Sequence, residues 1–164
     1  MHRQLLTILS LLTVAACGGI QYYTPEPQAE TVKLSLRRNL IQPILGSSTF
    51  VAVRPIKGAC RKGHPDDTNT LMIVDEGNPL IASHNAEGTE VTANKPIILH
   101  FQSVAGFSRC WNLVGFTPVE ERDYELTLSG SLLLDQESCQ VELRSKQLDG
   151  LDYEVDVLDF SESC

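Results

Sequence analysis

Alternating apolar and polar residues recur along this 164-residue chain after residue 30. Successive side chains of a β-strand point to opposite faces of a sheet, so a period of two predicts a strand with one buried face. Segments with this alternation, or with a short β-branched or apolar run, are 32–36, 49–53, 71–74, 97–101, 124–129, 139–144 and 153–157. The pattern therefore predicts an all-β domain.

Turn-forming residues separate these segments. Gly, Pro, Asn, Asp and Ser concentrate at 63–67, 76–79, 94–96, 135–138 and 149–150. About seven to nine strands at such spacing predict an antiparallel β-sandwich or barrel, and we favour the sandwich. The signal is weakest at 37–48, since Pro43 cannot donate the hydrogen bond of a central strand. Residues 31–164 are expected to form one domain.

The first sixteen residues have a different pattern. Arg3 and the free amine give a positive start, and an apolar run of twelve residues follows from Leu5 to Ala16. That run is shorter than the roughly 20 residues that a spanning helix needs, but it has the length of a signal-peptide core and closes with small residues. Residues 1–16 are therefore predicted to be a cleaved export signal. Alternatively, residues 1–16 are an ordinary secretory signal that the cysteine at position 17 follows by chance, or they form a buried N-terminal helix.

The last four residues of this stretch are Val14, Ala15, Ala16 and Cys17. They resemble the lipobox of bacterial lipoproteins, an aliphatic residue and two small residues before a cysteine. The resemblance implies cleavage before Cys17, a diacylglyceryl group on its thiol and often a further acyl chain on its amine. Several acyl chains, at about 0.8 kcal/mol per buried methylene, anchor a protein stably where one chain binds reversibly.

Residues 17–30 are expected to be the lipidated N-terminus and a flexible segment, because Gly18-Gly19 and Pro25 to Pro27 favour extended chain. Position 18 is Gly, whereas Asp there commonly signals inner-membrane retention among lipoproteins of this kind. The resemblance thus implies the outer membrane, on its periplasmic face, with surface exposure as the alternative.

Four cysteines follow Cys17 in the chain: Cys60, Cys110, Cys139 and Cys164. An even number in an exported chain predicts two disulfides, because that compartment is oxidising. Three pairings are possible, and we favour Cys60–Cys110 with Cys139–Cys164, since each would join segments expected to be neighbours. Zinc sites use closely spaced cysteine pairs, which are not present, so no metal site or other cofactor is predicted.

A proline loop precedes the alternating strand that begins at Tyr124. Phe116-Thr117-Pro118 leads through 120–123 to Tyr124, which is similar to the tyrosine corner of immunoglobulin-like and fibronectin-like sandwiches. Residues 90–164 also resemble small periplasmic lipoproteins of unknown function that have F-x-P, a tyrosine and two late cysteines. Those proteins often have Gly in the loop, where this chain has Glu121.

Charge is concentrated at the end of the chain, where residues 119–164 hold thirteen acidic and three basic side chains. A negative surface repels polyanions, so nucleic acid is not an expected partner. Alternation predicts that Asp152, Glu154 and Asp156 form a solvated strand face while Tyr153, Val155 and Val157 face the core. The alternatives for this acidic end are a cation site or a basic partner.

No set of residues indicates catalysis, so the protein is predicted not to be an enzyme. His64 beside Asp66 and Asp67 is interpreted as a polar loop, with a small cation site as the alternative. His100 is interpreted as a satisfied or exposed strand histidine. Trp111 is expected to pack near a disulfide, with an anchor on a binding surface as the alternative. Ser83, His84 and Ser103 supply residue types of a serine hydrolase, but no G-x-S-x-G, P-loop or C-x-x-C motif is present.

These observations predict a lipid-anchored protein of the cell envelope with a non-catalytic role: binding, scaffolding or accessory work. Its partners would be the membrane, through the lipid, and another envelope protein. A first alternative is an inhibitor of lysozyme or of a protease, because an acidic surface suits a basic enzyme. A second alternative is an enzyme that uses scattered polar residues.

Overall fold

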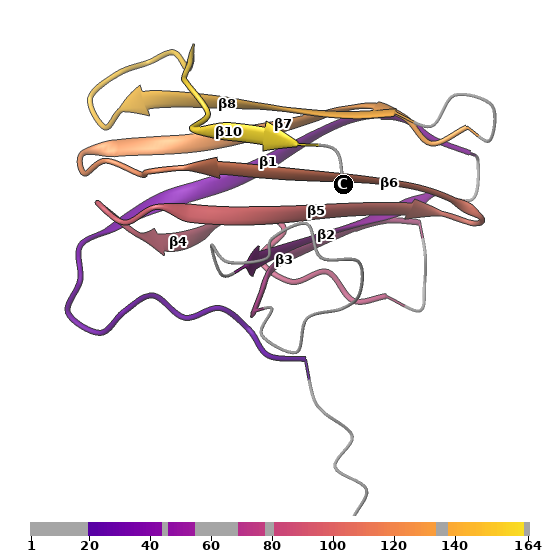
Figure 1. Ribbon diagram of the computed structural model, residues 1–164, viewed down its shortest axis with the longest axis horizontal. Helices are drawn as coiled ribbons and strands as arrows, with labels where there is room; N and C mark the ends of the chain where they lie inside the picture. The colour runs from indigo at the N-terminus through magenta and orange to yellow at the C-terminus, as the bar shows by residue number, and fades with distance from the viewer. Residues whose placement is uncertain (1–19, 44–45, 55–68, 78–80, 134–137, 163–164) are drawn as a thin grey trace, which may run out of the picture.

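The computed structural model describes residues 20–43, 46–54, 69–77, 81–133 and 138–162, and these form two five-stranded sheets packed as a sandwich (Figure 1). The first sheet has the order β4-β1-β7-β8-β9 and the second the order β10-β6-β5-β2-β3. The strands are β1 (Thr31–Ile41), β2 (Ser47–Arg54), β3 (Asn69–Glu76), β4 (Thr89–Thr92), β5 (Ile97–Ala105), β6 (Ser108–Phe116), β7 (Arg122–Ser131), β8 (Ser138–Gln147), β9 (Glu154–Val155) and β10 (Phe160–Glu162). The prediction of an all-β sandwich is confirmed.

The core lies between the two sheets and contains most of the apolar residues that the alternation predicted. Side chains with almost no exposure come from both sheets, among them Leu34, Leu126 and Leu128 from the first sheet and Leu99 and Phe101 from the second. Fully burying such a side chain contributes roughly 1.5–3 kcal/mol each. The period-two pattern thus identified the core faces of β1, β5 and β7.

One strand pair is parallel, whereas the sequence predicted an antiparallel sandwich. β1 pairs with β7 in parallel over eight residue pairs, from Leu34 opposite Tyr124 to Ile41 opposite Ser131. Parallel neighbours need a long connection, and here the chain from β2 to β6 supplies it before β7 returns beside β1. Alternation gives the buried face of a strand but not the direction of its neighbour, so the sequence did not reveal this pair.

The loop from β6 to β7 crosses between the sheets and contains the predicted tyrosine corner. The hydroxyl of buried Tyr124 accepts a hydrogen bond from the Val119 N–H at 2.8 Å. Glu121 has a φ of 62°, the left-handed conformation that usually favours glycine. The turn therefore forms with a glutamate in a conformation that glycine adopts more readily.

Residues 22–30 lie against one edge of the sandwich, although the sequence predicted that 17–30 are flexible. The Tyr23 N–H donates to the Thr70 carbonyl at 2.8 Å, and Tyr22 forms a parallel bridge with Thr70. The Thr92 N–H donates to the Tyr23 hydroxyl at 3.2 Å. Thr70 belongs to β3 and Thr92 to β4, the end strands of the two sheets, so the segment connects the sheets where both would otherwise have an open edge (Figure 1).

The C-terminal alternation predicted the wrong face for two valines. β9 pairs only with β8, and Val155 lies opposite Arg144 while Glu154 lies opposite Ser145. Leu143 and Ser145 are buried, so Arg144 and its partner Val155 occupy the outer face of the first sheet. Val155 and Val157 are accordingly 67% and 81% exposed instead of facing the core.

Candidate functional site

A disulfide joins the two sheets, but it does not have the predicted partners. Cys110 of β6 bonds to Cys139 of β8, with 5.8 Å between their Cα atoms. The predicted bonds Cys60–Cys110 and Cys139–Cys164 are therefore wrong, because β6 and β8 face each other across the core although 29 residues separate the two cysteines. Of the three pairings of four cysteines, only the one that joins Cys60 to Cys164 agrees with this bond. Both of those residues, like Cys17, lie outside the described residues.

Trp111 does not pack on the disulfide as expected. Cys110 faces the core, so the next residue of the strand points to the opposite face. There the Trp111 ring meets the ring of His100 on β5 edge-on, with 5.7 Å between centroids. His100 is buried, which agrees with its interpretation as a strand histidine.

The residues weighed for serine-hydrolase chemistry lie apart. The buried Ser103 hydroxyl is 2.7 Å from the Thr49 hydroxyl on the core side of the second sheet, and His100 lies on the other face of the same strand. Ser83 accepts a hydrogen bond from the Asp75 N–H at 3.1 Å, and the His84 ring lies 4.0 Å from the ring of Tyr22.

The loop residues weighed as a small cation site, His64, Asp66 and Asp67, lie outside the described residues. In the ranges that are described, no three His, Cys, Asp or Glu side chains gather as metal ligands. The same ranges contain no helix with the length and apolar character needed to cross a bilayer.

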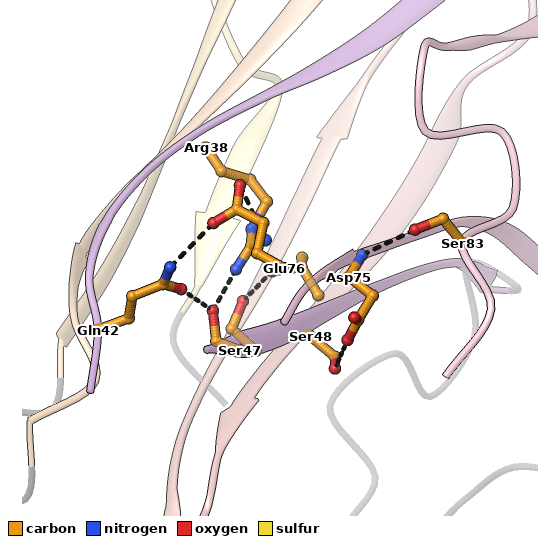
Figure 2. Close-up of polar contacts among 9 residues, drawn as sticks. Arg38, Gln42, Ser47, Ser48, Asp75, Glu76 and Ser83 are labelled. Atoms are coloured by element: carbon orange, nitrogen blue, oxygen red, sulfur yellow. Dashed lines mark hydrogen bonds and ion pairs between the residues drawn. The ribbon is translucent and has the colours of Figure 1, made fainter. Parts of the chain in front are cut away.

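Arg38 places a largely buried charge between the sheets, and the sequence analysis did not single it out. It continues the core-facing series 32, 34 and 36 of β1, and its side chain is only 3% exposed. Arg38 donates to the Ser47 hydroxyl, and its guanidinium lies 3.3 Å from a Glu76 carboxylate oxygen (Figure 2). Ser47 and Glu76 belong to β2 and β3, so Arg38 reaches from the first sheet to the second.

A network of short-range polar contacts surrounds this arginine. Gln42 accepts from the Ser47 hydroxyl and donates to Glu76 at 3.0 Å, and the Ser48 hydroxyl donates to Asp75 (Figure 2). Burial lowers the pKa of Arg38, while the charges of Glu76 and then Asp75 oppose this effect. The arrangement holds a charge between two sheets, which is a structural role. The sequence indicates the burial of Arg38 only in that position 38 is even-numbered, like the core-facing residues 32, 34 and 36 of β1.

A groove of about 330 Å³ opens beside β8, at the edge away from residues 22–30. Leu158 contributes apolar surface beside the buried Val141 and Leu143, and Glu142 and Asp156 contribute carboxylates. Asp156 also lies 3.6 Å from Arg122, and Glu142 lies 3.8 Å from Arg144. Such partly exposed ion pairs are weak, so these carboxylates can exchange partners with a ligand.

The chain matches no family model, and neither the curated proteins nor the solved structures contain a protein with detectable similarity to it. The resemblances noted in the sequence therefore stay predictions, and the function has to be argued from the residues and the fold.

Proposed function

We propose that this chain is a lipid-anchored binding protein of a bacterial cell envelope, held at the outer membrane through Cys17. The observation that carries the proposal is the Val14-Ala15-Ala16-Cys17 sequence at the end of a twelve-residue apolar run. Cleavage before Cys17 and acylation of its thiol would leave the sandwich as the part of the protein that meets its partner.

The position of residues 22–30 supports a close association with the membrane. Because Tyr22 already pairs with β3, only four residues lie between the domain and Cys17, which makes five steps from one Cα atom to the next. A fully extended chain spans at most about 3.3–3.6 Å per residue, so the reach is about 18 Å. The edge formed by β3 and β4 would then face the lipid, and the β8–β9 edge would point away from it (Figure 1).

The sandwich is further proposed to belong to the immunoglobulin-like class. The Tyr124–Val119 hydrogen bond in a loop between sheets supports this assignment, since that contact is typical of the class. The parallel β1–β7 pair is a departure from an entirely antiparallel arrangement.

The proposal is tested by mass spectrometry of the protein extracted from membranes. We expect an N-terminal peptide that begins at Cys17 and carries the mass of a diacylglyceryl group. Cys17→Ser should abolish this modification and release the protein from membranes, whereas Ser10→Ala should change neither. Gly18→Asp should move the protein to the inner-membrane fraction of a density gradient. A peptide that still contains Met1, or an unmodified Cys17, would contradict the proposal.

A further inference from the structure

One hairpin presents an unusual concentration of apolar side chains to solvent. Leu148, Leu151, Val155 and Val157 are 66%, 95%, 67% and 81% exposed, and all four lie in residues 148–157, which follow β8 and contain β9. Single exposed apolar residues are common on protein surfaces, but several together mark a surface that binds another molecule. We call these four residues with Asp152, Glu154 and Asp156 the β9 surface.

The charges of the β9 surface are largely unpaired. Arg122 pairs with Asp156, and the other basic side chains nearby are engaged with acids outside this surface: Arg144 with Glu125 and Glu142, and Lys146 with Asp123. Among the described residues, Asp149, Asp152 and Glu154 have no basic partner. A cationic partner would supply the missing charges, so this surface is electrostatically complementary to a basic protein.

The groove beside β8 gives this surface a specific shape. Asp156 and Leu158, which line it, alternate with Val155 and Val157 and therefore point to the other side of the same edge strand. Glu142 contributes a second carboxylate, and Leu158 is the accessible apolar side chain, because Val141 and Leu143 are only 8% and 2% exposed. A lysine or arginine packs its aliphatic stem on apolar surface while its charged end reaches a polar group. The groove offers both parts of that environment.

β9 itself offers little backbone for strand addition. The Val157 N–H is already bonded to the Asp156 carboxylate at 2.8 Å, and β9 is only two residues long. Both features discourage pairing with another strand. Recognition therefore depends on the side chains of the β9 surface.

From these observations we propose that the β9 surface docks a basic protein, which inserts a lysine or arginine side chain into the groove and packs apolar side chains on Val155 and Val157. This inference deepens the proposed binding function and rests on it. The surface lies at the opposite edge of the sandwich from residues 22–30, where a partner can reach it on the anchored protein (Figure 1).

Binding is measured with full-length protein in detergent, with lysozyme and cytochrome c as basic probes and their lysine-acetylated forms as controls. We expect saturable binding at low salt that acetylation removes. Val155→Ser with Val157→Ser should weaken binding about ten-fold or more, because it removes apolar contact while it keeps every charge. Phe107→Ser is the matched control, since Phe107 is 96% exposed in the β5–β6 turn, and it should change the dissociation constant less than about two-fold.

The charges are tested separately. Asp152→Asn with Glu154→Gln should weaken binding about ten-fold at low salt and flatten its salt dependence. Glu30→Gln with Glu87→Gln removes the same charge from exposed positions elsewhere and should have little effect.

Three results would overturn the inference. They are no saturable binding of either probe up to about 1 mM, equal binding by the native protein and both β9 variants, or a self-associating protein that Val155→Ser with Val157→Ser makes monomeric. The last result would mean that a second copy covers the surface. Binding is measured with protein in detergent, so the measurement can be made whether or not Cys17 is acylated. Failure to bind therefore contradicts only the docking surface, while an unmodified Cys17 contradicts only the lipid anchor.

Discussion

Tyr124 shows how one side chain connects a loop to the core. Its ring packs near Phe116, with 5.4 Å between centroids, and its hydroxyl accepts the Val119 N–H. Burial raises the pKa of Tyr124, and the Val119 hydrogen bond opposes part of that rise because it stabilises the phenolate. A folded-state pKa above the unfolded value of about 10 adds stability that is complete below pH 10 and is lost as the pH rises through the folded value.

Tyr124→Phe should lower the free energy of unfolding by about 1 kcal/mol at pH 7, because the Val119 N–H loses its acceptor. The difference in the free energy of unfolding between the two proteins should shrink above pH 10. The protein with Tyr124 loses stability there, because its tyrosine ionises in the unfolded state and stays protonated when buried, and the Phe variant has no such group. Urea denaturation at pH 7 and pH 10.5 measures both values, with Tyr153→Phe as the control. A deficit that does not change with pH would contradict this explanation.

Glu121 carries a conformational cost at the same corner. A left-handed backbone costs a residue with a Cβ roughly 1–2 kcal/mol, and glycine avoids that cost but loses more entropy on folding. Glu121→Gly should therefore raise the free energy of unfolding by about 0.5–1 kcal/mol in urea denaturation. Glu87→Gly, at an exposed turn position without a positive φ, should instead lower it. Equal changes for the two variants would show that the conformation of Glu121 has no such cost.

Among the elements, β6 and β8 are connected by the Cys110–Cys139 bond in addition to their packing. Peptide mapping without reduction should find these two cysteines in one crosslinked peptide. In the chain-entropy description, a loop of this length contributes about 3–4 kcal/mol. Cys110→Ala with Cys139→Ala should lower the free energy of unfolding by a similar amount, measured by urea denaturation. A peptide that joins Cys110 to Cys60 would contradict the assignment.

The whole sandwich depends on contacts that cross between its sheets, and Arg38 supplies a charged one. Arg38→Ala should lower the free energy of unfolding by about 2–4 kcal/mol, since it removes a buried stem and leaves Ser47 without its donor. Arg38→Met keeps the volume of the stem and needs no ion partner, so it should stay within about 1 kcal/mol of the native protein. Denaturation curves distinguish the two. If Arg38→Met is as unstable as Arg38→Ala, the ion pair with Glu76 is worth more than the packing.

Residues 22–30 also hold the two sheets of the molecule together, because they connect β3 to β4 through Tyr23 and Thr92. Its proline and glycine content predicted an extended chain. The hydrogen bonds that hold it to the sandwich depend on which strands are at the edges, and composition carries no information about that.

The sequence by itself determined the all-β class, the core faces of β1, β5 and β7, and the contact of Tyr124 with the loop before it, because each depends on local spacing. β4, β6 and β10 lie outside the segments that alternation predicted. Only the tertiary structure decided the parallel β1–β7 pair, the partner of Cys110, the burial of Arg38 and the exposure of Val155 and Val157. These depend on which strands become neighbours and in which register. Alternation specifies that a strand has two faces, but the neighbouring strand decides which face is buried.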